Sequence, residues 1–320
     1  MATLQRTRTK LQRRVLWTIV GTVLGVTPAL AEFPDHSITL IVPWNAGGST
    51  DQTARPLAKA AEQILGQPVV IVNKPGASTT VGMTELARSK PDGYTIATLS
   101  SSTYMAPLTG IRVQYDPIKS FTFISYYGDN LIGVVVQKSA KWKTLKELIN
   151  DGKARPGTIT YGAPGVSSTQ NLMTKAMQAE SGAKFVFVPY TGSSQTVPAL
   201  LGGHVDFITE VSVWAPYLAN DQVRVLAVNT PTRVSSLPDV PTLKELGYPY
   251  LRSVQGIVGP AGIPADRAKK LEHAFRAAMK SEAFLTTMQR LRMVITDMSG
   301  SDTKQVIEDE IAKAKKFLAK

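Results

Sequence analysis

The 320-residue sequence contains no cysteine and only three histidines. Without cysteine, the protein has no disulfide bonds, no thiolate metal site and no cysteine nucleophile. His36, His204 and His273 lie far apart in the sequence and on unrelated predicted elements, whereas a zinc site usually takes paired ligands at short spacing. We therefore predict neither a metal site nor a histidine-based catalytic centre.

The sequence also lacks the loop motifs of common enzymes. The serine-containing loops GASTT, GVSST and GSSQT do not match the G-x-S-x-G nucleophile elbow. No glycine loop ends in glycine-lysine followed by serine or threonine, and no G-x-G-x-x-G follows a strand. An exported hydrolase would need a base beside Ser49 or Ser168, and no histidine is placed to serve. We predict a protein that is not an enzyme, has no catalytic residues and takes no cofactor.

The longest apolar run stands at the N-terminus. A basic segment without acids comes first, formed by Arg6, Arg8, Lys10, Arg13 and Arg14. The apolar run VLWTIVGTVLGV follows, and then the small residues Ala29-Leu30-Ala31. This order is typical of a cleaved signal peptide, and the apolar run is short for a membrane anchor. We predict cleavage after Ala31, a periplasmic mature protein, and general secretion rather than the twin-arginine route.

Charge limits the partners that the protein can have. The formal net charge is +12, and removal of the five basic residues of the signal peptide leaves +7. The remaining lysines and arginines are scattered, apart from the C-terminal KAKKFLAK. Nucleic-acid binding needs a basic stripe with a recognition element, so we predict no nucleic-acid partner. A composition of 43% hydrophobic and 19% charged residues is typical of a soluble globular protein, which we expect to be a monomer.

Short apolar runs alternate with amphipathic segments from residue 37 onward. SITLIV, PVVIV and YTIATL indicate strands at residues 37–42, 68–72 and 94–99, with helices between them, and the alternation returns after residue 131. This pattern predicts an α/β fold with mainly parallel sheets flanked by helices. After the signal peptide (1–31) we expect one domain from residues 32–132 and 253–320 and another from 133–252. Two crossing strands would form a hinge, with the ligand cleft between the domains.

Four loops rich in hydroxyl residues follow predicted strands: PWNAGGSTD (43–51), LSSST (99–103), YGAPGVSST (161–169) and PYTGSS (189–194). Open α/β sheets bind ligands at the C-terminal ends of their strands, where the amides that start a helix favour a negative group. The loops contain no lysine or arginine and only one acid, Asp51. A phosphate usually receives a cationic partner, so these loops suit a carboxylate or carbonyl held by neutral dipoles. Plain helix capping is the alternative for any single loop.

These loops also carry a family resemblance. PWNAGGSTD resembles the P-(F/W)-x-x-G-G-x-x-D signature of the Bug proteins, the solute-binding components of tripartite tricarboxylate transporters. Further matches follow in family order: GQPVVIVNKPGAS, KPDGYTIATLSSS, YDPIKSFTFIS, KARPGTITYGAPGVSST, VPYTGSSQTVPALLGGHVDF, SLPDVPTLKELGYP and GPAGIPAD. The resemblance implies the two-domain type II periplasmic binding protein fold. It also implies a small carboxylate held by amides, hydroxyls and bridging waters.

The loops and the resemblance together predict a receptor for a dicarboxylate, tricarboxylate or aromatic acid that delivers it to membrane components of a tripartite tricarboxylate-type transporter. The alternative is a sensor that presents ligand occupancy to a membrane signalling partner. Glu210 stands where relatives often carry Asp or Asn, and it would receive a ligand amine or hydroxyl or form a hinge contact. The predicted ligand-binding residues are Trp44, Gly48, Ser49, Thr50, Asp51, Ser101, Ser102, Gly165, Ser167, Ser168, Thr169, Tyr190, Thr191 and Glu210.

Overall fold

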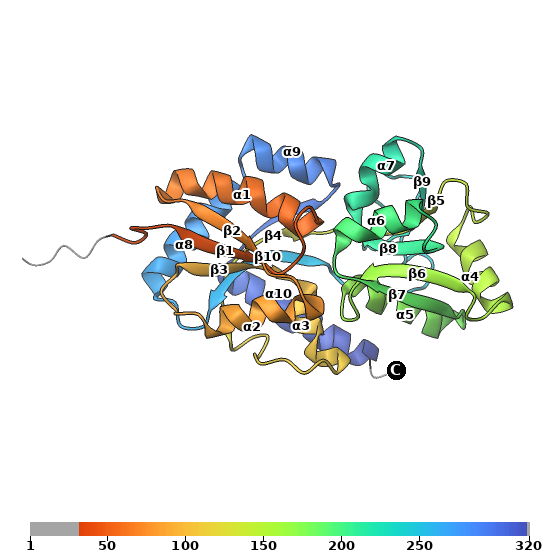
Figure 1. Ribbon diagram of the computed structural model, residues 1–320, viewed down its shortest axis with the longest axis horizontal. Coiled ribbons are helices and arrows are strands. Elements are labelled where there is room, and N and C mark those ends of the chain that lie inside the picture. Colours follow the sequence, from red (N-terminus) through yellow and green to blue (C-terminus); the bar gives the residue numbers. More distant parts are fainter. Residues whose placement is uncertain (1–31, 319–320) are drawn as a thin grey trace, which may run out of the picture. The chain divides into compact units, whose positions relative to one another are not determined.

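The computed structural model describes residues 32–318, so the predicted signal peptide lies outside the described residues. The described chain contains two mixed sheets, each flanked by helices (Figure 1), which confirms the expected α/β fold. The sheets were expected to be mainly parallel, but five of their nine strand pairings are antiparallel. We call the six-stranded sheet with its helices the first lobe, and the five-stranded sheet with its helices the second lobe. None of the helices within residues 32–318 is long and apolar enough to cross a membrane.

The first lobe has the strand order β11-β4-β10-β3-β1-β2. β1 pairs in parallel with β2 and β3, whereas β10 pairs antiparallel with β3 and β4, and β11 pairs antiparallel with β4. Parallel pairing is thus confined to the part of the sheet that the first strand–helix units build. The strands are β1 (Ile38–Val42), β2 (Val69–Asn73), β3 (Thr95–Ser100), β4 (Phe121–Asp129), β10 (Val254–Pro260) and β11 (Val294–Ser299).

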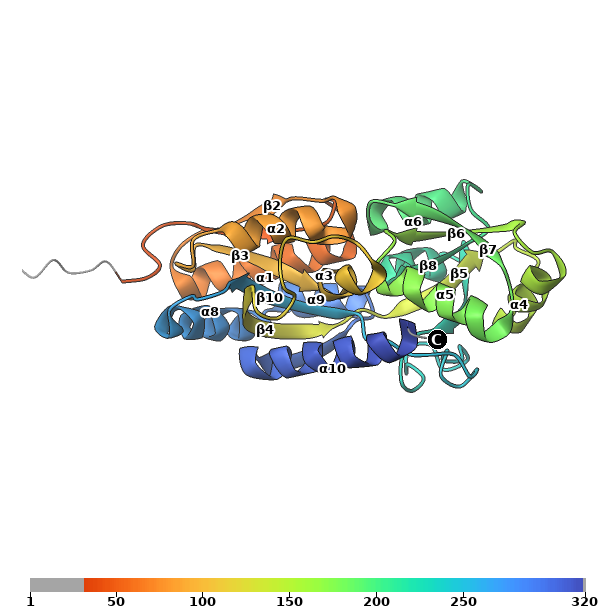
Figure 2. The same ribbon diagram turned by 90° about the horizontal axis from the view of Figure 1, so that it is seen from below.

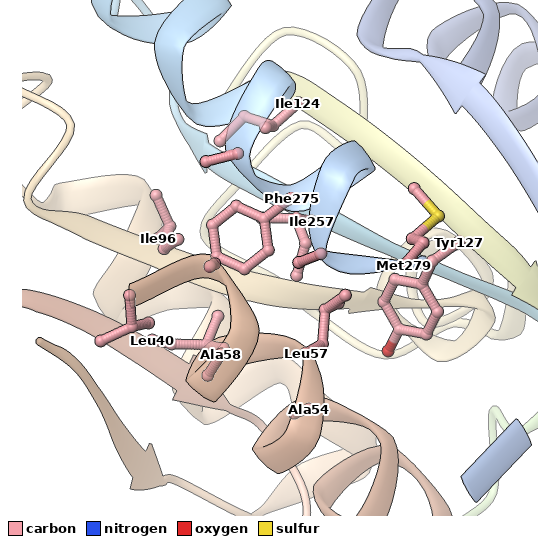
Figure 3. Packing of buried hydrophobic residues seen from close by; sticks show 14 of the residues in the cluster. Leu40, Ala54, Leu57, Ala58, Ile96, Ile124, Tyr127, Ile257, Phe275 and Met279 are labelled. Carbon is pink, nitrogen blue, oxygen red and sulfur yellow. The ribbon is translucent and has the colours of Figure 1, made fainter. Parts of the chain in front are cut away.

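Helices cover both faces of this sheet. On one face, Leu40, Leu57 and Phe275 pack in a shared core (Figure 3), which the helices α1 (Ser49–Leu65), α8 (Ala265–Ala278) and α9 (Glu282–Arg290) enclose. On the other face, a second core contains Met83 and Tyr104. It is covered by α2 (Thr80–Arg88), α3 (Ser101–Met105) and α10 (Gly300–Leu318), with the short helices η1 (Ala77–Thr79) and η2 (Pro107–Thr109). Figure 2 shows α10 running along β4.

The helix α1 begins directly at the PWNAGGSTD loop. Its buried residues Ala54, Leu57, Ala58 and Ala61 recur at helical spacing and face the core. Gly66 ends the helix in the left-handed conformation (φ 70°), with its N–H bonded to the Glu62 carbonyl. The burial of this face fixes where the N-terminus of the helix points, and that terminus lies at the candidate site.

The second lobe has the strand order β7-β6-β8-β5-β9. β6 pairs in parallel with β7 and β8, and β5 pairs antiparallel with β8 and β9. The strands are β5 (Ile132–Gln137), β6 (Ile159–Pro164), β7 (Phe185–Tyr190), β8 (Phe207–Val211) and β9 (Val223–Val228). The helices are α4 (Leu145–Ala154), α5 (Thr169–Ser181), α6 (Ser193–Leu201), η3 (Ser212–Trp214) and α7 (Ala215–Ala219).

The chain passes between the two sheets at two adjacent places. β4 continues into β5 through Asn130 and Leu131, and β9 leads to β10 through residues 229–253. The Asn130 N–H donates to the Ser253 carbonyl at 2.8 Å, so the two connections are bonded to each other. This is the geometry that a hinge would need, and the division into two moving domains stays a prediction.

Candidate functional site

A small cavity of about 30 Å³ lies where loops of the first and second lobes meet. Its walls come from the last residues of β3, β6 and β8 and from the segments that follow β1, β3, β6 and β7. The two connections between the sheets and the start of β10 complete them. The lining residues are Trp44, Gly48, Ser49, Thr50, Ser100, Ser101, Ser102, Asn130, Pro164, Thr169, Gln170, Ser193, Val211, Ser253 and Gln255. These residues are uncharged, and most of them carry a hydroxyl or an amide.

Three helices present their N-termini to this cavity. α1 starts with Ser49 and Thr50 in the cavity wall, and its N-cap residue, Gly48, offers no side chain to satisfy the first amides. α5 starts with Thr169 in the wall, and α6 starts with Ser193 behind another glycine cap. The unsatisfied amides at a helix start carry partial positive charge. The N-terminal ends of three helices therefore face the cavity, and none of its lining residues is cationic.

A buried carboxylate holds the loop that precedes α1. Asp51 is 2% exposed and accepts hydrogen bonds from the Gly47 N–H (2.9 Å), Arg55 Nε (2.9 Å), Arg55 Nη2 (2.8 Å) and Asn73 Nδ2 (3.0 Å). Burial opposes ionisation, but the bonds from Arg55, Gly47 and Asn73 outweigh it and keep the pKa of Asp51 below its usual value. Asp51 is thus an ionised anchor of the loop, and its oxygens face protein donors.

A second buried carboxylate stands behind the wall of the second lobe. Glu210 is 0% exposed. Its Oε1 accepts from Ser193 Oγ (2.8 Å), the Val211 N–H (2.7 Å) and Gln170 Nε2 (3.4 Å), and its Oε2 accepts from Thr196 Oγ1 (2.6 Å). Burial raises the pKa of Glu210 to about 7, although the bonds from Thr196, Ser193, Val211 and Gln170 act in the opposite direction. Two of these donors, Ser193 and Gln170, also line the cavity.

The lobes are in direct contact beside the cavity. Asn45 Nδ2, in the first-lobe loop, donates to Thr191 Oγ1 of the second lobe at 2.6 Å. Gln195 Oε1 accepts from both the N–H and the hydroxyl of Thr191, which fixes the orientation of Thr191. A cavity of about 30 Å³ has room for about two water molecules, so a carboxylic acid of several carbon atoms requires the walls to separate further.

The structure brings half of the predicted site residues to the cavity. Trp44, Gly48, Ser49, Thr50, Ser101, Ser102 and Thr169 line it. Others lie beside it: Ser168 caps α5 by accepting from the Asn171 N–H, Thr191 bonds Asn45, and Gly165, Ser167 and Tyr190 belong to the same loops. Asp51 and Glu210 lie behind the walls, where they hold other residues.

A side chain that lines the cavity is not always free to bond a ligand. The Ser101 hydroxyl lines the cavity, but it donates to the Arg252 carbonyl and accepts from Tyr104 Oη and the Val254 N–H. By contrast, Thr169 Oγ1 is buried and has no hydrogen-bond partner among the described residues. Thr169 is therefore a better candidate for a ligand contact than Ser101.

Sequence reasoning missed several lining residues, namely Ser100, Asn130, Pro164, Gln170, Ser193, Val211, Ser253 and Gln255. Ser100, Pro164 and Ser193 lie inside the predicted loops and Gln170 immediately follows one, so the loop pattern could have included them. Asn130, Ser253 and Gln255 come from the connections between the sheets and the strand after them, and no local motif marks them.

Comparison with known proteins agrees with the fold. The model of the tripartite tricarboxylate transporter family receptor matches residues 53–320. A protein from the gbd 5' region of Cupriavidus necator is 35% identical over 301 residues, which cover 93% of this chain and 92% of that protein. Two solved structures are similar over most of the chain. The periplasmic binding protein BugD has 26% identity and a TM-score of 0.82, with 90% of this chain and 97% of BugD covered. An R. palustris protein solved with adipate has 27% identity and a TM-score of 0.83, with 89% and 97% covered.

Proposed function

The chain belongs to the tripartite tricarboxylate transporter receptor family, and from this premise we propose that it captures a small organic carboxylate between its lobes and delivers it to the membrane components of a transporter. The family is one of periplasmic binding proteins and not of enzymes. We further propose that residues 1–31 are removed on export, so that the mature receptor begins at Glu32.

The observation that supports a carboxylate ligand most strongly is the convergence of three helix N-termini on a cavity with an uncharged lining. Backbone amides at helix starts bind anions, and hydroxyl donors such as that of Thr169 can bond carboxylate oxygens. A phosphate group would usually attract lysine or arginine as well. The R. palustris relative with adipate is consistent with the same ligand class.

Domain closure would couple binding to delivery. The cavity has walls from both lobes, so a ligand that contacts both walls favours the state in which they are close. The two connections between the sheets, bonded through Asn130 and Ser253, are the proposed hinge. The membrane components would then recognise the closed receptor.

Thr169→Val tests the ligand site directly. The substitution removes a buried hydroxyl that has no partner among the described residues, so the ligand-free protein should be at least as stable as the wild type. A bond from that hydroxyl to a charged carboxylate contributes about 1.5–3 kcal/mol, so affinity for the bound acid should fall roughly tenfold to a hundredfold. Thermal-shift screening of organic acids on the mature, ligand-stripped chain identifies which acid binds. Calorimetry then measures the affinity of the wild type and of the variant for that acid.

Thr103→Val is the matched control. Thr103 Oγ1 is also buried without a partner among residues 32–318, but Thr103 does not belong to the lining of this cavity. The control variant should keep the wild-type affinity. The proposal fails if no carboxylate raises the melting temperature, and the assigned site fails if the two variants weaken binding equally.

A further inference from the structure

The hydrogen bonds of Glu210 fix the direction in which the Ser193 hydroxyl points. Oε1 accepts from the backbone N–H of Val211 at 2.7 Å, and a backbone N–H can only donate. Oε1 is therefore an acceptor whether Glu210 is ionised or carries a proton on Oε2, beside Thr196 Oγ1 (2.6 Å). The Ser193 hydroxyl, 2.8 Å from Oε1, must donate its hydrogen to Glu210 in both states. Ser193 Oγ can consequently offer a ligand only its lone pairs.

A second acceptor of the cavity wall is fixed in the same way. Asn130 Nδ2 lies near the Ser253 carbonyl (3.4 Å) and Ser253 Oγ (3.1 Å). A carbonyl can only accept, which assigns the nitrogen to that side. Asn130 is 5% exposed, and its Oδ1 has no hydrogen-bond partner among the described residues. Two lining residues, Ser193 and Asn130, thus each carry an oxygen that can receive a hydrogen bond and cannot donate one, namely Ser193 Oγ and Asn130 Oδ1.

We propose that Glu210 is a positioning residue that selects, through Ser193, carboxylic acids bearing a hydroxyl or ammonium group over acids of the same skeleton without one. The inference rests on the proposed function, because it concerns the ligand of the same cavity. The helix starts and Thr169 would take the carboxylate, and Ser193 and Asn130 would take hydrogens from the second group. An acid without a donor leaves these oxygens unpaired in a buried site, which lowers its affinity.

The surroundings of Glu210 make the orientation of the Ser193 hydroxyl independent of pH. α6 and β5 carry no titratable side chain. α5 carries Lys175 and Glu180, both exposed, and β6 carries Tyr161, whose hydroxyl donates to Asn171 Oδ1. Glu210 is thus the titratable group at this wall, and its protonation on Oε2 leaves the Ser193 bond unchanged.

Matched pairs of acids test the proposal. We would measure the binding of lactate against propionate, malate against succinate, and aspartate against succinate to the mature chain by calorimetry at pH 6 and 8.5. In every pair that binds, the wild type should favour the donor-bearing acid at least tenfold at both pH values. Ser193→Ala should reduce this ratio severalfold. Glu210→Gln, whose carbonyl oxygen can occupy the position of Oε1, should keep it.

Each other outcome is informative. Equal affinity within the pairs would overturn the inference while the proposed function stands. Loss of the ratio in Glu210→Gln would also overturn it, because that result would assign the selection to the charge of Glu210 and not to the orientation of Ser193. If no organic acid in the thermal-shift screen raises the melting temperature of the mature chain, the proposed function itself is refuted. Thermal unfolding of each variant confirms that it is folded before binding is compared.

Discussion

Substitution of Asp51 by asparagine should destabilise the protein and weaken ligand binding together. Asp51 receives four hydrogen bonds on two oxygens, from Gly47, Arg55 and Asn73. The amide of asparagine has nearly the same shape but replaces one oxygen by an NH₂ group. Two of the four donors would then face another donor. If the NH₂ group takes the place of Oδ2, the Gly47 N–H and Arg55 Nε lose their acceptor and the loop that leads into α1 loses its anchor; if it takes the place of Oδ1, Arg55 Nη2 and Asn73 Nδ2 lose theirs.

The size of the effect follows from these contacts. A buried donor left without an acceptor costs about 1–3 kcal/mol. The Arg55 side chain is 54% exposed, so water replaces part of the hydrogen bonding that it loses. The free-energy cost at Arg55 therefore lies at the low end of that range. The sum for Asp51→Asn is about 2–4 kcal/mol. At about 2 °C per kcal/mol for a chain of this length, the melting temperature should fall by about 4–8 °C at pH 7.

The pH dependence has a defined sign. The pKa of Asp51 is lower in the folded protein than its ordinary value of 3.8. Its stabilisation is therefore fully present above that ordinary value and is lost as the pH falls through the lower folded value. The difference in melting temperature between the wild type and Asp51→Asn should be constant from pH 7 to 5 and shrink below pH 4.

Asp151→Asn is the matched control. Asp151 also accepts from an arginine four residues later, Arg155, through Nε (2.8 Å) and Nη2 (2.6 Å), but it lies on α4, away from the cavity lining. Both variants should unfold earlier in circular dichroism, and only Asp51→Asn should lower the affinity for the acid. An unchanged melting temperature for Asp51→Asn, or an equal loss of affinity in the control, would refute the reasoning.

Two further predictions concern closure and charge. Gly165→Ala would place a Cβ 2.3 Å from Ser78 Oγ of the other lobe, at a φ of +86°, so we expect affinity to fall roughly tenfold by interference with closure. Gly157→Ala has a similar φ (+72°) and open space, so calorimetry should show wild-type affinity for it. Ionisation of Glu210, whose pKa is about 7, should weaken binding of anionic acids by roughly tenfold between pH 6 and 8.5. In Glu210→Gln the affinity should not change with pH. An equally steep change of affinity with pH in that variant would contradict this prediction.

The fold was readable from the sequence where local patterns and tertiary burial agree. The spacing of Ala54, Leu57 and Ala61 predicted α1 because the same residues face the core, and the strands before the glycine loops are buried as expected. β4 (Phe121–Asp129) and the five-residue α3 were not predicted. β4 lies between β10 and β11, and this position depends on pairing with segments more than a hundred residues away.

The site could be predicted from the sequence only in part. Whether a polar side chain is free to bind a ligand depends on partners that lie far away in the sequence. Ser101 has the sequence context of a ligand contact, but Arg252 and Val254 already use its hydroxyl. Asp51 was predicted as a ligand-binding residue, and in the structure its oxygens accept from Gly47, Arg55 and Asn73. Gln255 enters the cavity wall from a strand whose sequence carries no binding motif.

An uncharged lining has a consequence for how such a receptor closes. A cleft lined by arginine or lysine would bury an unpaired charge if it closed without an anion, at a cost of several kcal/mol. Helix amides and hydroxyls carry only partial charges, and each helix terminus contributes about 0.3–1 kcal/mol to an anion. The contact between Asn45 and Thr191 can therefore form without a bound acid. Discrimination between the empty and the ligand-bound receptor must then come from groups that only a ligand satisfies, and the unpaired atoms Thr169 Oγ1 and Asn130 Oδ1 of two lining residues are groups of this kind.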